Sequence, residues 1–175
     1  LHSLRRRQRQ MCIRDSYLLE MRASGRDKVQ DYADKFGCEF HAGEKPWGLG
    51  ADKVDIMMPC ATQNDVNMDS AKKIAASGIK YYIEVANMPT TNDALEFLKE
   101  QKHMVIAPSK AVNACGVAVS ALEMAQNAER LYWTAEEVDA KMHQIMANIY
   151  HSSVAAAERY GLGYDLVAGA NIVGF

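Results

Sequence analysis

The sequence of 175 residues predicts a doubly wound α/β fold with a mainly parallel sheet, followed by long C-terminal helices. The first observation behind this prediction is that short apolar strands alternate with helical patterns in units of roughly 25 residues. The second is that glycines and prolines end these segments, at points where helices and central strands cannot continue. Strand-helix units of this length connect by right-handed crossovers, which produce parallel strands covered by helices.

The first predicted elements lie between residues 28 and 80. A helix over Lys28–Phe36 ends at a glycine, and a short strand is expected around Glu39–His41. The segment Val54–Pro59 has the pattern of a buried strand that its proline ends. Asn67 is placed to cap the next helix, and Gly78 is placed to stop it.

The remaining elements follow the same alternation. The strand Tyr81–Val85 leads into a helix capped by Thr90 or Thr91, and Met104–Pro108 is the next strand. Two longer helices complete the prediction, one from Asn113 to Arg130 and one from a capping box at Thr134–Glu137 onward.

Composition limits the classes of function. Hydrophobic residues make up 49% and charged residues 24%, which is typical of a globular domain. The net charge of -2 gives no overall attraction to nucleic acid or to anionic lipid, and no apolar run reaches the roughly 18 residues that a spanning helix needs. The cysteines and histidines lack metal-ligand spacing, so we expect no metal, and unpaired thiols favour a reduced, cytoplasmic chain. The cysteines are Cys12, Cys38, Cys60 and Cys115.

Residues 1–16 differ from the rest in composition. Arginines crowd this segment, which ends in the string Met11-Cys12-Ile13-Arg14-Asp15-Ser16. Such charge is compatible with a targeting segment or a nucleic-acid arm. The string instead resembles a translated sequencing-adaptor tail, so we interpret residues 1–16 as non-native and residues 17–175 as the partial domain.

Polar side chains follow three of the predicted strands. Ala61, Thr62 and Gln63 come after the first of them, Asn87 comes after the strand Tyr81–Val85, and residues 109–113, which end in Asn113, come after the strand Met104–Pro108. Ligands of open α/β sheets bind beyond the carboxyl ends of the strands, so we expect these three polar ends to lie on one rim and to form a single site. The amide of Asn87 offers a donor and an acceptor, which suits a second amide such as a carboxamide. An Asx turn is the alternative explanation for this asparagine.

The helix that begins at Asn113 carries a second set of candidates. Asn113, Val117 and Ser120 are spaced to lie on one helical face, and Gly116 beside them would let a ligand approach the main chain. A helix N-terminus favours an anion. This face therefore suits an aliphatic carboxylate, whereas the alternative is that Ser120 packs against a neighbouring helix.

Three motifs together resemble the cofactor-domain signatures of hexameric glutamate dehydrogenases, and the bacterial NADP-linked group most. The resemblance runs from about Tyr17 to Phe175 and implies a Rossmann-like domain. The motifs are Cys60-Ala61-Thr62-Gln63-Asn64, Glu84-Val85-Ala86-Asn87-Met88-Pro89-Thr90-Thr91 and Pro108-Ser109-Lys110-Ala111-Val112-Asn113-Ala114-Cys115-Gly116-Val117.

The resemblance implies a role for each candidate. Ala61, Thr62 and Gln63 would line the cleft for NADP or NAD, and Asn87 would hold the nicotinamide carboxamide. Asn113 would support the substrate pocket, in which Val117 and Ser120 contact glutamate or 2-oxoglutarate. The implied reaction is reversible oxidative deamination with ammonium as a partner, without nucleic acid or membrane. The family forms a homo-hexamer at full length, and we do not expect this chain alone to form one.

Two departures and one absence qualify the resemblance. Cys115 and Val85 stand where the family commonly has glycine, and Cys115 would be strained if its φ had to be positive. No Gly-x-Gly-x-x-Gly or Gly-x-Gly-x-x-Ala motif for the pyrophosphate occurs in the sequence. We therefore expect a fragment that is inactive alone and contains no catalytic residue. A branched-chain or aromatic amino-acid dehydrogenase and a non-catalytic nucleotide-binding module remain alternatives.

Overall fold

The computed structural model describes residues 15–25, 29–49 and 54–175. The chain divides into two compact units, residues 1–44 and residues 45–175, and each unit is described by itself. Of the expected non-native tail, residues 1–14 lie outside the described residues, and Asp15 and Ser16 begin a helix over residues 15–23. No helix in the described ranges is both long and apolar enough to cross a membrane.

The first unit is built around a small aromatic cluster. The ring of Tyr17, in the helix over residues 15–23, lies 5.5 Å from the ring of Phe36 in α2 (Val29–Phe36). Ala33 is buried in α2 as well. The predicted strand at Glu39–His41 is wrong, because these residues are exposed and form no ladder with any described strand. A strand without a partner leaves its backbone groups unpaired.

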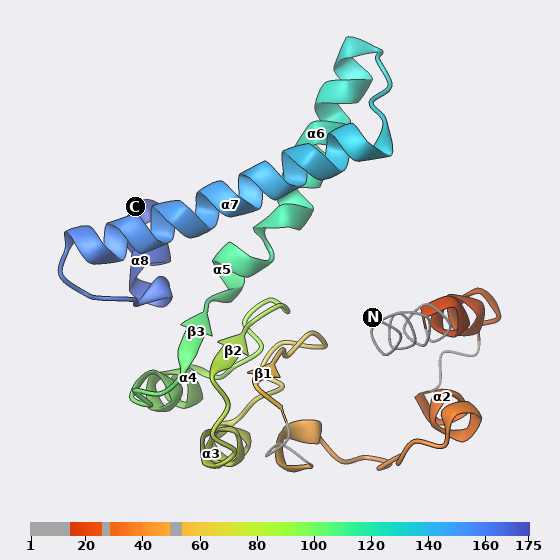
Figure 1. The fold of residues 1–175 in the computed structure, drawn as a ribbon, viewed down its shortest axis with the longest axis vertical. Helices are drawn as coiled ribbons and strands as arrows, with labels where there is room; N and C mark the ends of the chain where they lie inside the picture. The colour runs from red at the N-terminus through yellow and green to blue at the C-terminus, as the bar shows by residue number, and fades with distance from the viewer. Residues whose placement is uncertain (1–14, 26–28, 50–53) are drawn as a thin grey trace, which may run out of the picture. The chain divides into compact units, whose positions relative to one another are not determined.

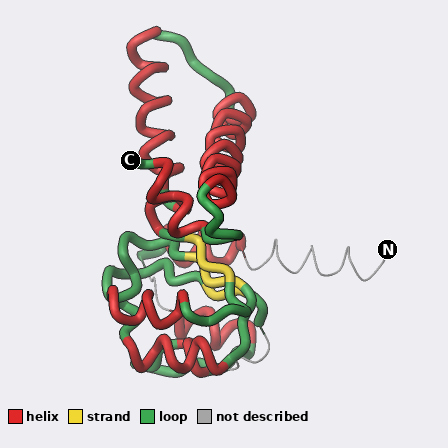
Figure 2. Tube along the Cα trace, turned by 90° about the vertical axis from the view of Figure 1, so that its left-hand side faces the viewer, coloured by secondary structure: helices red, strands yellow, loops and turns green. Residues whose placement is uncertain are grey.

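The second unit contains a three-stranded parallel sheet. Its strands are β1 (Ile56–Met57), β2 (Tyr81–Ile83) and β3 (Val105–Ala107), in the order β1-β2-β3. Figure 2 shows them as the yellow layer, and their carboxyl ends point the same way. The parallel α/β prediction is therefore confirmed.

Two helices cover one face of this sheet, α3 (Met68–Ala76) and α4 (Asn92–Lys99) (Figure 1). The register aligns Met57, Tyr82 and Ile106 in one row, and all three side chains are buried. Apolar residues of the two helices complete this core, together with Trp47 of η1 (Pro46–Gly48) and Val167. The helical residues are Ala71, Ile74, Ala94 and Leu98.

The opposite row of the sheet is more exposed. Ile56 is 50% exposed and Tyr81 is 44% exposed, because successive side chains in a strand point to opposite faces. Val54 and Met58 are about half exposed too. The prediction that Val54–Pro59 is a buried strand is thus correct for Met57 and Pro59 only.

The N-cap positions of three helices agree with the prediction, and two of these caps make the expected side-chain hydrogen bond. Asn67 accepts a hydrogen bond from the backbone N–H of Ser70, and Thr134 forms the expected capping box. Thr91 stands at the N-cap of α4 without a side-chain cap hydrogen bond. The hydroxyl of Thr90 instead lies 2.8 Å from the buried hydroxyl of Tyr82, so it serves tertiary packing.

Four helices follow the sheet. They are α5 (Ser109–Val112), α6 (Ala114–Glu129), α7 (Ala135–Arg159) and α8 (Leu166–Val173). Helices α6 and α7 contact each other and extend away from the sheet, whereas α8 packs against α7 and β3 (Figures 1 and 2). The short helix α5 is an addition to the prediction, which began a helix at Asn113.

Candidate cofactor and substrate site

The loop after β1 is tied to the loop after β2. The carbonyl of Pro59 accepts hydrogen bonds from the backbone N–H groups of Val85 and Ala86, at 3.2 and 3.0 Å. Farther along the first loop, the N–H of Asn64 donates to the carbonyl of Met88 at 3.0 Å. The exposed segment of residues 61–63 lies between these two attachments. The structure therefore places Ala61, Thr62 and Gln63 alongside the loop that carries Asn87.

The loop after β2 is tied in turn to the start of α5. The N–H of Glu84 donates to the carbonyl of Ala107 at 3.0 Å, and the side-chain Oε2 of Glu84 accepts from the N–H of Ser109 at 3.2 Å. The carboxyl ends of all three strands are thus joined into one rim. This grouping is the arrangement that the sequence predicted.

Asn113 connects α5 and α6 to the same rim. Its Nδ2 lies 2.6 Å from Oδ1 of Asn87 and 3.3 Å from the carbonyl oxygen of Val85. The carbonyl of Val85 can only accept, so the atom of Asn113 that faces it must be the amide nitrogen. The atom of Asn87 that faces this nitrogen must then be an oxygen. One backbone carbonyl thereby fixes the orientation of both amides.

This orientation defines what Asn87 presents to a ligand. Its oxygen is engaged by Asn113, and its side chain is exposed at the rim. The amide nitrogen, with two donor hydrogens, is the group left to meet the oxygen of a carboxamide. The Asx-turn alternative does not account for the contact with a side chain 26 positions away.

The backbone near Asn87 adopts an uncommon conformation. Met88 has φ 43° and Asn64 has φ 55°, both in the left-handed region. Asparagine tolerates this region well, whereas methionine is less favourable there. Cys115 and Val85 are not among the described residues with positive φ, so neither replacement of a glycine strains the backbone.

The buried side chain of Tyr82 supports the loop that carries Asn87 and Met88. Its hydroxyl is hydrogen-bonded to Thr90, which follows Asn87 and Met88 in the chain and is 4% exposed. Burial raises the pKa of Tyr82 above its usual value, more than the hydrogen bond with Thr90 lowers it. The hydroxyl is therefore neutral at physiological pH.

The predicted face of α6 is open. Val117 is 76% exposed, and a Cβ placed on Gly116 would meet no atom within 4 Å. Ser120 is also exposed, and its hydroxyl donates to the carbonyl of Gly116 at 3.2 Å. The hydroxyl of Ser120 is thus already used within α6, and it must rotate to meet a ligand.

The amino end of α6 is less available to an anion than the sequence suggested. Helix α5 runs into α6 through Asn113, whose N–H donates to the carbonyl of Ser109 at 2.9 Å. The N–H of Gly116 is engaged as well, by the carbonyl of Asn113. A carboxylate at this face would depend more on Ser120 than on free backbone groups.

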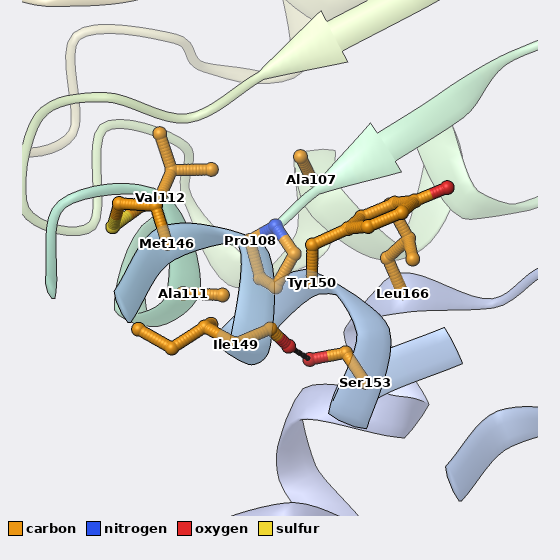
Figure 3. Close-up of a pocket in the computed structure, with 9 residues that line it drawn as sticks. All are labelled: Ala107, Pro108, Ala111, Val112, Met146, Ile149, Tyr150, Ser153 and Leu166. Carbon is orange, nitrogen blue, oxygen red and sulfur yellow. Dashed lines mark hydrogen bonds between the residues drawn. The ribbon is translucent and has the colours of Figure 1, made fainter. Parts of the chain in front are cut away.

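A separate cavity of about 110 Å³ lies among β3, α5, α7 and α8 (Figure 3). Its lining is almost entirely apolar, and the hydroxyl of Ser153 points to the carbonyl of Ile149 at 2.8 Å. None of the predicted site residues lines it. Within the described ranges no three histidine, cysteine, aspartate or glutamate side chains are grouped as metal ligands.

The sequence interpretation gave no separate role to two residues at this rim. Glu84 is 3% exposed and bonds to the start of α5, and Lys110 contacts the side-chain oxygen of Asn171 in α8. Glu84 lies in the second of the three motifs and Lys110 in the third. A carboxylate at the end of an apolar strand was the signal that could have identified Glu84.

Comparisons with known proteins identify the family. Residues 10–175 match the family of glutamate/leucine/phenylalanine/valine dehydrogenases. The chain is 72% identical over 160 residues to an NAD-specific glutamate dehydrogenase from Clostridium symbiosum, covering 91% of this chain and 35% of that protein. It is 50% identical to the NADP-specific glutamate dehydrogenase of Escherichia coli K12, covering 90% and 34%.

A solved glutamate dehydrogenase structure has the same fold over the matched part. Its TM-score is 0.85 at 72% identity, covering 91% of this chain and 35% of that one. The chain spans about a third of the length of the relatives that it matches. The match over residues 10–175 shows that the chain belongs to the glutamate/leucine/phenylalanine/valine dehydrogenase family.

Proposed function

We propose that residues 17–175 are the later part of the NAD(P)-binding domain of a glutamate dehydrogenase. The whole protein would carry out the reversible oxidative deamination of L-glutamate to 2-oxoglutarate and ammonium. The observation that carries this proposal is the contact between Asn113 and Asn87 at the carboxyl ends of the strands. It leaves an oriented amide donor where a dinucleotide lies in this fold class.

Each site residue has a part in this function. Asn87 holds the carboxamide of the nicotinamide, and Ala61, Thr62 and Gln63 line the cleft beside it. When bound, the nicotinamide supplies the hydride chemistry, and the protein orients it. The exposed Val117 gives an apolar contact to the carbon chain of the substrate. Ser120 donates its hydroxyl to the side-chain carboxylate.

Glutamate is favoured over an aliphatic or aromatic substrate by the exposed hydroxyl of Ser120. The relatives at 72% and 50% identity are also named glutamate dehydrogenases. The test uses a chimera in which this chain replaces the matching third of the Clostridium symbiosum enzyme. Ser120→Ala should raise KM for glutamate about tenfold, the effect of one lost hydrogen bond to a charged group.

The same chimera distinguishes glutamate from the alternative assignments. Ser120→Ala should leave turnover of leucine, valine or phenylalanine unchanged, since those side chains have no acceptor for the hydroxyl. Equal effects on glutamate and on the others would favour the branched-chain or aromatic amino-acid dehydrogenase. A chimera that binds nucleotide without turnover of any amino acid would favour the non-catalytic module.

The 175-residue chain alone should not oxidise NADH or NADPH with 2-oxoglutarate and ammonium, whereas the chimera should. The pyrophosphate-binding glycine motif is absent from this sequence, and no residue here is assigned as catalytic. Turnover by the 175-residue chain alone would refute the proposed division of the domain. Loss of turnover in the chimera, with its fold intact, would refute the functional match.

The proposal extends to cofactor, assembly and compartment. The resemblance stated from motifs pointed to the NADP-linked group, whereas the identity is higher with the NAD-specific relative, so the cofactor is proposed as NAD or NADP. We place the whole protein in the cytoplasm as a homo-hexamer. Size-exclusion chromatography of the chimera tests the assembly.

A further inference from the structure

Glu84 is a buried carboxylate that the proposed function leaves without a role. It follows β2 directly, it is 3% exposed, and its Oε2 accepts a hydrogen bond from the N–H of Ser109 at 3.2 Å. Burying an ionised carboxylate is costly unless its oxygens are hydrogen-bonded. A residue of this kind therefore requires an explanation beyond packing.

The position of Ser109 gives the explanation. Ser109 is the first residue of α5, and Pro108 at the N-cap makes no side-chain cap hydrogen bond. A helix N-terminus has backbone N–H groups without partners inside the helix. Glu84, in the loop directly after β2, supplies the acceptor for one of these groups, the N–H of Ser109.

The far end of α5 is held by the same loop. One turn after Ser109, the side chain of Asn113 reaches the carbonyl of Val85 and the amide oxygen of Asn87. The segment Glu84–Asn87 thus makes hydrogen bonds to both ends of α5, at Ser109 and at Asn113. The position of Asn113 depends on where α5 begins, because the N–H of Asn113 donates to the carbonyl of Ser109 at 2.9 Å.

We propose that Glu84 is a positioning residue, which fixes the start of α5 and thereby holds Asn113 against Asn87. This inference rests on the proposed function, since it takes Asn87 as the nicotinamide anchor. Glu84 does not touch the cofactor. Its loss should let α5 shift and release the amide pair from its single orientation.

The test removes the hydrogen bond from the donor side. Ser109→Pro in the chimera deletes the backbone N–H, and proline is favoured at the first helical position. The extended ψ of 146° at Pro108 is compatible with a following proline. Ser109→Ala is the matched control, because it keeps the N–H and removes only the hydroxyl.

Binding is measured for NADH and for ADP-ribose, a cofactor fragment without nicotinamide. Ser109→Pro should weaken NADH about tenfold and leave ADP-ribose within about twofold, whereas Ser109→Ala should change neither. Glu84→Gln should act in the same direction as Ser109→Pro, since a neutral acceptor binds the N–H less strongly. Glu96→Gln, on the exposed face of α4, is its control.

A double-variant cycle separates positioning from general loss of structure. In an Asn87→Ala background, Ser109→Pro should weaken NADH no further, because the anchor is already gone. Effects that multiply, or equal weakening of NADH and ADP-ribose, would overturn the role of Glu84. If Asn87→Ala is selective for NADH and both Ser109→Pro and Glu84→Gln have no effect, this inference fails while the proposed function stands. If Asn87→Ala is itself not selective, both fail.

Discussion

Asn113 and Asn87 form a side-chain hydrogen bond of 2.6 Å between the loop after β2 and the junction of α5 with α6. The residues are 26 positions apart, and both amides are oriented by the carbonyl of Val85. The pair therefore joins the proposed cofactor side of the rim to the helix that carries the proposed substrate residues.

The first prediction concerns the charge and donors of Asn113. Asn113→Asp removes both donor hydrogens and places a carboxylate against the carbonyl of Val85 and the oxygen of Asn87. Three acceptors that face one another repel. In the chimera, Asn113→Asp should therefore bind NADH more weakly than Asn113→Ala does. Fluorescence titration measures this order. Asn148→Asp, at an exposed position of α7, is the control, and the reverse order would show that the amide orientation is wrong.

The second prediction concerns the packing of α7 against α8. A Cβ on Gly169 would overlap the backbone carbonyl of Ser153, so Gly169→Ala should cost more than about 2 kcal/mol of unfolding free energy. Gly116→Ala is a matched change, because Gly116 is also helical and has open space around it. It should be neutral or stabilise by up to about 1 kcal/mol. Urea unfolding of this chain compares the two, and similar free energies would contradict the close packing.

The third prediction concerns the alkaline stability of the core. The pKa of Tyr82 is raised by burial, so in the folded chain its hydroxyl stays neutral at a pH of about 10, where an unfolded tyrosine ionises. The stability from neutral Tyr82 is therefore full below about pH 10 and falls as the pH rises above it.

Tyr82→Phe tests this account at two pH values. At pH 7 the variant leaves the hydroxyl of Thr90 without Tyr82, which should cost about 1 to 2 kcal/mol. Above about pH 10 its stability should fall less steeply with pH than that of the parent chain. Tyr132→Phe is the control, because Tyr132 is 94% exposed. An unchanged slope in Tyr82→Phe would mean that Tyr82 ionises as easily in the folded chain as in the unfolded one.

The sequence predicted the parts of the fold that depend on local chemistry. The cap at Asn67 and the capping box at Thr134 are confirmed, because a cap needs only side chains within three residues. The strand at Glu39–His41 is wrong and the burial of Val54–Pro59 is partial, because pairing and burial depend on neighbours that are distant in sequence.

The site was predicted as a rim but not as a set of contacts. The strand ends predicted that Asn87 and Asn113 lie at one edge, since parallel strands place their carboxyl ends together. Their hydrogen bond depends on the short helix α5, which the sequence pattern did not reveal. The hydrogen bond from Ser109 to Glu84 is likewise a tertiary contact, between residues 25 positions apart in the sequence.

The most direct test of the proposed anchor is the binding of NADH and ADP-ribose to the chimera with Asn87→Ala. If Asn87 holds the nicotinamide carboxamide, the variant should weaken NADH about tenfold and leave ADP-ribose within about twofold. Asn148→Ala, on α7, should change neither ligand. Equal weakening of NADH and ADP-ribose by Asn87→Ala, or no weakening of either, would contradict the assignment.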